Sequence, residues 1–208
     1  MNIEWKALPG LPPPAPEETQ PGVAGPFAGI HGNTLIIAGG ANFKDTLPWN
    51  GGKKYYHDDI YTLHLPANGG TWKSCRGLTS LPCPVAYGAS ASVDAGLICM
   101  GGETETGLTD KTYMISVAGD RMIITPGPSL PVPLSSAASA ALGSKVYIAG
   151  GLTPDGASRA LFCIDTENLA AGWHKLADMP IPLINSVMVA FGGKEPGLWL
   201  AGGRTRSE

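Results

Sequence analysis

The sequence has few charged residues, no long apolar run and no excess of basic residues. Only 15% of its 208 residues are charged, well below the roughly 25% of an average soluble domain. Its 14 basic residues are outnumbered by 17 acidic ones, which gives a net charge of −3, so it offers no basic surface for a nucleic acid or an anionic membrane. No apolar stretch approaches the roughly 18 residues that a membrane-spanning helix needs. We therefore expect neither a nucleic acid nor a membrane among its partners.

Cysteine is also scarce. The four cysteines, Cys75, Cys83, Cys99 and Cys163, include no Cys-x-x-Cys pair, and no histidine stands at the spacing of a zinc site. Cys99 and Cys163 lie within apolar runs and are expected in the core. A disulfide between Cys75 and Cys83 is the weaker alternative, and it would require an oxidising compartment. We expect no metal.

A secretion signal is absent from the first ten residues, MNIEWKALPG, which have neither an apolar core nor a small-residue cleavage site. At face value the chain is expected to stay in the cytoplasm where it is made. A periplasmic location would require a leader that has already been removed.

Glycine and proline, in contrast, are abundant, with 29 and 19 residues, and they separate short apolar runs. A Gly-Gly doublet ends an apolar run four times, with a repeat of about fifty residues. The doublets are Gly39-Gly40, Gly101-Gly102, Gly150-Gly151 and Gly202-Gly203. A Leu-Pro or Met-Pro turn and a run of small residues precede each doublet. An aromatic run follows three of them, and a run that contains Trp5, Trp72 or Trp173, or RMIIT where Trp is missing, closes the unit. The pattern predicts four short strands per unit, A to D.

These features resemble the kelch repeat, whose fold is a β-propeller. The resemblance implies an all-β chain of four-stranded antiparallel blades, with six blades in the full ring and about three and a half in this sequence. The chain is expected to form a single propeller fragment over 1–208, with blades at 24–75, 85–126 and 135–177, strands A and B of a fourth blade at 184–203, and a closing D strand at 3–8. We expect a ring truncated at its C-terminus. Its open blade faces should drive self-association or pairing with a complementing chain.

Residues 3–125 have a more specific resemblance, and the rest of the chain is only generally kelch-like. Their segments are similar to the N-acetylneuraminate epimerase (sialic acid mutarotase) family. These segments are 5–8, 22–30, 35–43, 50–55, 59–61, 86–88 and 101–104. In that family the matching stretch lies in the C-terminal half of the chain, so the order here resembles a cyclically permuted branch. A closed ring tolerates permutation because its termini meet at one blade.

The resemblance implies interconversion of the α and β anomers of free sialic acid, without a cofactor. Such a reaction needs a base for the anomeric hydroxyl and an acid for the ring oxygen, and the sugar carboxylate calls for a cation. In the family a Glu and an Arg after a strand B carry the acid/base role. In the permuted order they would lie on a last blade that this sequence does not contain, so no catalytic residue is assigned. We expect the chain to be inactive alone. The alternative is a non-catalytic kelch module that binds a protein or a glycan.

Antiparallel topology places the B–C and D–A connections of every blade on one face. The segments after the four doublets should therefore share a rim, where binding residues are expected. These segments are 41–58, 103–110, 152–159 and 204–208. The first is long enough to be a lid or a binding loop.

Five residues of this rim are the candidates for binding sialic acid or a related sugar. Glu103 is expected to bind a sugar hydroxyl or, as the alternative, to cap backbone amides of its turn, and Arg204 to bind the carboxylate or to stay solvated. Trp49 is outside the register of the blade tryptophans and is a candidate for stacking on a sugar. Asn42 and Tyr55 are candidates by position, as are the rim residues Lys53, Lys54, His57, Glu105 and Arg159. The pair Lys53-Lys54 is expected to form a solvated tip, and His57-Asp58-Asp59 a polar lead into strand C.

Overall fold

The computed structural model describes residues 3, 5, 7–13, 21–65, 70–75, 79–119 and 121–205. Its regular structure is almost entirely β. Within the described ranges the only helices are two short 3-10 turns, η1 (Pro48–Asn50) and η2 (Leu169–Ala171). Accordingly, this part of the chain has no helix that is long and apolar enough to cross a membrane.

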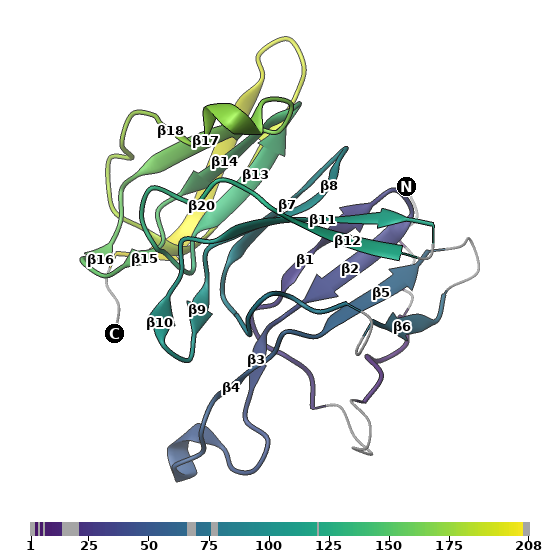
Figure 1. Ribbon diagram of the computed structural model, residues 1–208. Helices are drawn as coiled ribbons and strands as arrows, with labels where there is room; N and C mark the ends of the chain where they lie inside the picture. The colour runs from purple at the N-terminus through teal and green to yellow at the C-terminus, as the bar shows by residue number, and fades with distance from the viewer. Residues whose placement is uncertain are drawn as a thin grey trace.

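Three four-stranded antiparallel sheets follow one another along the chain, and a two-stranded sheet follows them (Figure 1). Blade 1 contains β1 (Phe27–His31), β2 (Thr34–Ala38), β5 (Ile60–His64) and β6 (Trp72–Ser74). Blade 2 contains β7 (Ala89–Val93), β8 (Gly96–Met100), β11 (Thr112–Ala118) and β12 (Arg121–Pro126). Blade 3 contains β13 (Ala138–Leu142), β14 (Lys145–Ala149), β17 (Leu161–Asp165) and β18 (His174–Lys175). The half blade contains β19 (Ile184–Phe191) and β20 (Gly197–Arg204). These sheets confirm the predicted kelch blades in the order A-B-C-D.

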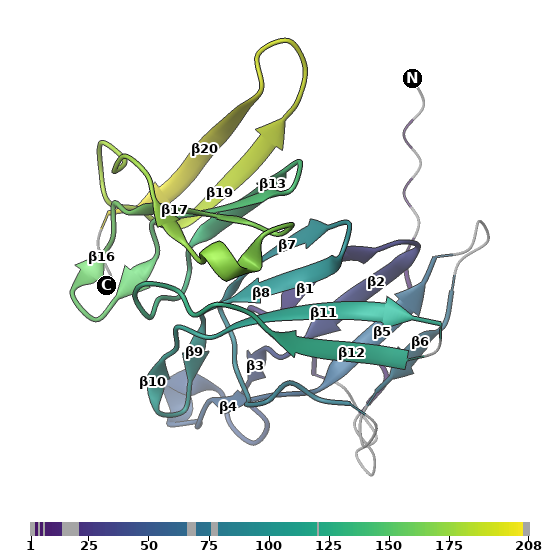
Figure 2. The same ribbon diagram turned by 45° about the horizontal axis from the view of Figure 1, so that its top comes forward.

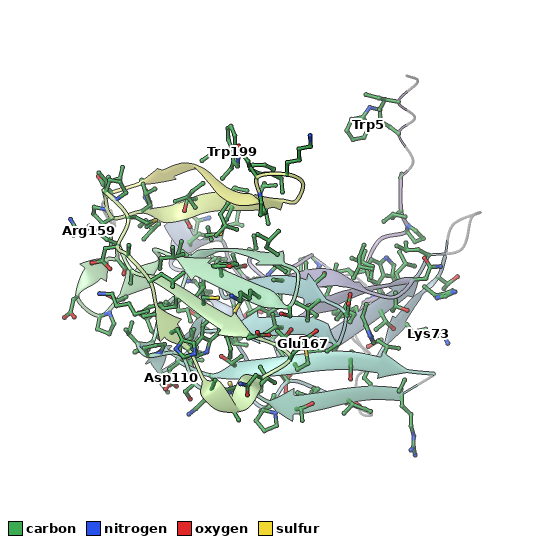
Figure 3. All side chains as sticks on the ribbon, turned by 90° about the horizontal axis from the view of Figure 1, so that it is seen from above. Trp5, Lys73, Asp110, Arg159, Glu167 and Trp199 are labelled. Carbon is green, nitrogen blue, oxygen red and sulfur yellow. The ribbon has the colours of Figure 1, made fainter. Side chains whose placement is uncertain are left out.

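The expected closing strand at 3–8 is not formed at its described positions. Residues 3, 5, 7 and 8 lie outside any strand, and residues 4 and 6 lie outside the described residues. A D strand pairs with the C strand of its own blade, but β5, β11 and β17 already pair with β6, β12 and β18. With no C strand left to pair with in the described chain, Trp5 is 93% exposed and stands apart from the sheets (Figure 3).

The Gly-Gly doublets join neighbouring blades. Gly101 has a φ of 62°, in the left-handed region that glycine tolerates best. A Cβ atom on it would lie 2.4 Å from the carbonyl oxygen of Leu134, which leads into blade 3. The N–H of Gly102 donates a hydrogen bond of 2.8 Å to that same oxygen. The doublets of blades 1 and 3 repeat this clamp on the carbonyl groups of Val85 and Leu183.

Tryptophans at or just before strand D tie blades 1 and 3 to a preceding segment of the chain. The indole N–H of Trp72 donates to the carbonyl oxygen of Pro9 over 2.7 Å, and that of Trp173 donates to Pro128 over 3.0 Å. The recurrence of this bond explains why tryptophan recurs at this position of the repeat.

The apolar core lies between successive sheets (Figure 2). Side chains of blades 1 and 2 that are at most 2% exposed form one cluster, which includes Ile36, Ile60, Leu97 and Ile115. A second cluster, between blades 2 and 3, includes Ile98, Met100, Val146, Ile148 and Ile164. A smaller third cluster joins blade 3 to the half blade. Each blade is therefore stabilised mainly by its neighbours, as in other repeat folds.

The cysteines take up the roles expected of core residues. All four are free, so the alternative disulfide between Cys75 and Cys83 is not formed. Cys99 is completely buried, and burial raises the pKa of its thiol far above the usual range. Cys163 is also buried.

Candidate functional site

The connection after each doublet of the full blades forms a small two-stranded ribbon. The three ribbons pair β3 (Ala41–Asn42) with β4 (Tyr55–Tyr56), β9 (Glu103–Thr104) with β10 (Gly107–Leu108), and β15 (Leu152–Thr153) with β16 (Gly156–Ala157). The three emerge on the same side of the molecule (Figure 1). The D–A connections meet them there through the bridges Ala24–Ala41, Ala86–Glu103 and Ser135–Leu152. We call this side the rim.

An ionic cluster joins the first two ribbons. Oε1 of Glu103 accepts a hydrogen bond of 3.1 Å from the Lys54 ammonium group and a second one from the Tyr56 hydroxyl. The Lys54 nitrogen also lies 5.5 Å from the ring centre of Tyr56 and 5.0 Å from that of Tyr87, within the range of cation–π attraction. Both side chains of the ion pair are 32% exposed. The carboxylate of Glu103 therefore binds partners across the rim, so the structure does not favour turn capping as its main role.

The surroundings of this cluster fix its protonation. Partial burial alone would lower the pKa of Lys54, but the hydrogen bond and the negative charge of Glu103 outweigh it and raise that pKa. Burial, together with the hydrogen bond to Glu103, raises the pKa of the Tyr56 phenol. At neutral pH, Lys54 is therefore a cation and Tyr56 a neutral hydroxyl.

A cleft with a volume of about 690 Å³ opens beside this cluster. Its size is in the range of small-molecule sites. Charged residues on its wall are Lys53, Lys54, Glu105 and Lys111. Its remaining lining residues include several hydroxyl groups, those of Tyr55, Tyr56, Thr104, Thr106, Thr109 and Tyr113. The cleft thus combines three lysines, each paired with a carboxylate of Glu105, Glu103 or Asp110, with many hydroxyl donors and acceptors.

Asn42 connects segments of the rim. Its amide nitrogen donates to the carbonyl oxygen of Gly22 over 3.0 Å, and its amide oxygen lies 2.9 Å from Nε2 of His57. His57 in turn has Nδ1 3.9 Å from a carboxylate oxygen of Asp59. No group of three or more His, Cys, Asp or Glu residues able to hold a metal occurs in the described ranges. His57 and Asp59 therefore form the polar lead into strand C.

Tyr55 lies in β4 of the first ribbon, and Trp49 lies on the extension beyond it. The hydroxyl of Tyr55 donates to Asp45 over 3.0 Å, and its ring lies 5.7 Å from the Lys44 nitrogen. Trp49, on η1, is 76% exposed. Of these two residues only Tyr55 lines the cleft.

Arg204 is not brought to the ionic cluster. It ends β20 in the half blade, is exposed, and makes no ion pair with any described residue. Arg159, the other arginine of the rim, lies 3.8 Å from the carboxylate of Asp178. Among the five predicted sugar-binding candidates, only Tyr55 lines the cleft. Glu103 lies behind the lining, bound to Lys54 and Tyr56, and Arg204, Trp49 and Asn42 also lie outside it.

Sequence reasoning missed Tyr56 and Tyr87, and it treated Lys53-Lys54 as one solvated tip. The structure separates these two lysines, which lie just before β4: Lys53 makes an exposed pair with Glu105, whereas Lys54 pairs with the partly buried Glu103. The alternation of side chains along an extended segment, applied to 53–56, could have shown that Lys53 and Lys54 point in different directions.

Comparisons with known proteins match the first part of the chain to one family. The N-acetylneuraminate epimerase family profile matches residues 1–124. A Brucella suis protein named N-acetylneuraminate epimerase is 36% identical over 120 residues, covering 53% of this chain and 29% of its own length. A Vibrio vulnificus protein of the same name is 32% identical over 130 residues, covering 58% and 32%, and one from Escherichia coli is 37% identical over 131 residues, covering 59% and 33%. The aligned part of this chain thus spans about a third or less of these relatives.

The structural comparison extends beyond the matched segment. The solved structure of YjhT superposes with a TM-score of 0.63 and 14% sequence identity, covering 80% of this chain and 56% of that one. At this identity the likeness shows the fold. With its four-stranded blades and ribbon-lined rim, the chain is a kelch-type β-propeller protein. Because the family profile covers more than half of its residues, the chain belongs to the N-acetylneuraminate epimerase family.

Proposed function

We propose that this chain is part of a sialic acid mutarotase and that its cleft binds N-acetylneuraminate. The observation that carries this proposal is the position of the ionic cluster. Lys54, Tyr56 and Glu103 all lie inside the segment 1–124 that matches the epimerase family.

The chemistry of the cleft suits an acidic sugar. Lys54, which is paired with Glu103, supplies a partly desolvated cation for the carboxylate, and the ion-paired Lys53 and Lys111 lie at the same wall. Glu105 and the surrounding hydroxyl groups provide acceptors and donors for the sugar hydroxyls. The same chemistry would suit other small sugar acids, and the choice of N-acetylneuraminate as the proposed substrate is supported by the name of the matching family.

Removal of the central cation should weaken binding. In the Lys54→Met variant we expect the Kd for N-acetylneuraminate to rise at least tenfold, because a charge-assisted hydrogen bond contributes about 1.5–3 kcal/mol. Ligand-observed NMR titration of the full chain measures this. The control is Lys145→Met, which removes an exposed lysine at the start of β14. Equal affinity in wild type and Lys54→Met would contradict the proposed binding mode.

Binding and catalysis should separate in this chain. We expect the 208-residue polypeptide to leave the rate of α-to-β exchange of free N-acetylneuraminate unchanged, because the acid/base roles that the family resemblance gives to a Glu and an Arg are assigned to no residue of this chain. NMR exchange spectroscopy of the two anomers measures the rate, with bovine serum albumin as the protein control. An acceleration of several orders of magnitude would show that this chain holds its own acid and base. Absence of any sugar binding would favour the alternative, a non-catalytic kelch module.

A further inference from the structure

Four residues at equivalent positions of the repeat have a left-handed backbone. They are Gly25 (φ 60°), Tyr87 (φ 58°), Ser136 (φ 55°) and Asn185 (φ 57°), and they lie at or just before the first strand of successive sheets. In the described ranges, the last three are the only residues other than glycine with a positive φ. This conformation is unfavourable for any residue that carries a Cβ atom.

These four residues form a continuous hydrogen-bonded ladder across the blades. The N–H of Tyr87 donates to the carbonyl oxygen of Gly25 over 2.7 Å, that of Ser136 to Tyr87 over 2.7 Å, and that of Asn185 to Ser136 over 2.9 Å. The ladder crosses from one sheet to the next at the rim, beside the bridges that join the D–A connections to the ribbons. It holds one side chain from each of blades 2, 3 and the half blade in register.

The first position of the ladder is a glycine, so the ladder itself requires no side chain. The side chains at the other three positions are therefore candidates for a separate role. The Tyr87 side chain packs on Gly25, where an added Cβ atom would lie 2.4 Å from the Tyr87 ring. The same ring lies beneath the Lys54 ammonium group. Within the described part of the chain, neither Ser136 nor Asn185 makes a side-chain hydrogen bond. Residues held in such unfavourable conformations tend to cluster at functional sites.

A hollow of about 310 Å³ lies against the ladder. Its lining is formed by Tyr87, Gly88, Ser136, Ala137, Asn185 and Ser186. Ser186 is only 9% exposed, and its buried hydroxyl has no hydrogen-bond partner among the described residues. A buried polar group without a partner is rare in folded proteins, and this one belongs to a residue that lines the hollow.

We propose that this ladder hollow is a neutral sugar subsite, which binds hydroxyl and acetamido groups through Ser136, Asn185 and Ser186. None of its lining residues is charged, whereas the adjacent ionic cluster offers charge. An asparagine amide both donates and accepts, which matches an acetamido group, and each serine hydroxyl can do both for a sugar hydroxyl. Tyr87 touches both sites, since it lines the hollow and lies under Lys54. The identity of the ligand rests on the proposed function: the carboxylate of N-acetylneuraminate binds at Lys54 and its neutral groups bind in the hollow.

The test uses Ser136→Gly combined with Asn185→Gly in the full chain. Glycine keeps the left-handed backbone, as Gly25 does, and removes only the side chains. The probes are N-acetylneuraminate and N-acetylglucosamine, a neutral sugar that has hydroxyl and acetamido groups but no carboxylate. The matched control is Ser144→Gly, in the turn between β13 and β14.

We expect the double variant to raise the Kd of both sugars at least tenfold in an NMR titration, with a Tm no lower than that of wild type. Unchanged affinity for both sugars would overturn the subsite, as would no binding of either sugar to wild type. A Tm that falls in the double variant but not in Ser144→Gly would assign these side chains a structural role instead. Lys54→Met separates the two proposals, because it should weaken only N-acetylneuraminate. If it weakens neither sugar while the double variant weakens both, the carboxylate site fails and the subsite stands.

Discussion

Replacing Gly101 by alanine is expected to destabilise the chain by roughly 2–5 kcal/mol. About 1–2 kcal/mol follows from the left-handed backbone, which a Cβ atom disfavours. The rest follows from overpacking, since the new methyl group would lie 2.4 Å from the carbonyl oxygen of Leu134. That oxygen also accepts the hydrogen bond of Gly102, so any shift that relieves the clash weakens the clamp between blades 2 and 3.

The fourth doublet provides the matched control. Gly202 has nearly the same backbone, with φ 69°, but a Cβ atom added to it would meet no atom within 4 Å. Gly202→Ala should therefore cost only the backbone contribution, about 1–2 kcal/mol. Thermal unfolding followed by circular dichroism compares the two variants, and the Tm of Gly101→Ala should fall by roughly 10 °C. Equal losses in the two variants would mean that the contact with the next blade does not stabilise the fold.

This contrast explains why the blades could be predicted from the sequence. Each Gly-Gly doublet marks a left-handed backbone that few residues other than glycine adopt, and this backbone recurs once per blade. The tryptophans recur for a similar reason, because each donates to one carbonyl group of a preceding turn. Repeated constraints of this kind are visible in a single sequence without knowledge of distant contacts.

The binding residues were harder to predict because their roles depend on pairing across blades. Glu103 was a candidate, but its partners Lys54 and Tyr56 lie 47 to 49 residues earlier. The left-handed positions of Tyr87, Ser136 and Asn185 were missed because glycine is the residue that indicates such a backbone, and among the four positions it occurs only at Gly25. The expected strand at 3–8 differs from the structure for another reason. A sequence pattern typical of a strand forms one only where a partner strand is available.

The outer face of the half blade is the second feature with a large expected effect. Residues of β19 that point toward blade 3, Ile184 and Met188, are buried, whereas the alternate residues Val187 and Val189 are 65% and 58% exposed. Trp199 on β20, opposite Val189, is 70% exposed and points away from the other blades (Figure 3). A strand that is apolar on both faces is typical of one buried between two layers.

We expect this face to drive self-association of the 208-residue chain through an interface of more than roughly 1,000 Å². Burial of a large apolar side chain contributes about 1.5–3 kcal/mol, so charges at two of these positions should disrupt the contact. The variant Val187→Lys with Trp199→Glu should raise the dissociation constant at least a hundredfold, and sedimentation equilibrium measures it. Ile123→Lys is the control, because Ile123 on β12 is also 49% exposed but lies in blade 2, outside this face. A wild-type chain that stays monomeric at micromolar concentrations would show that this face does not associate, and an equal effect of Ile123→Lys would show that the half blade is not the contact surface.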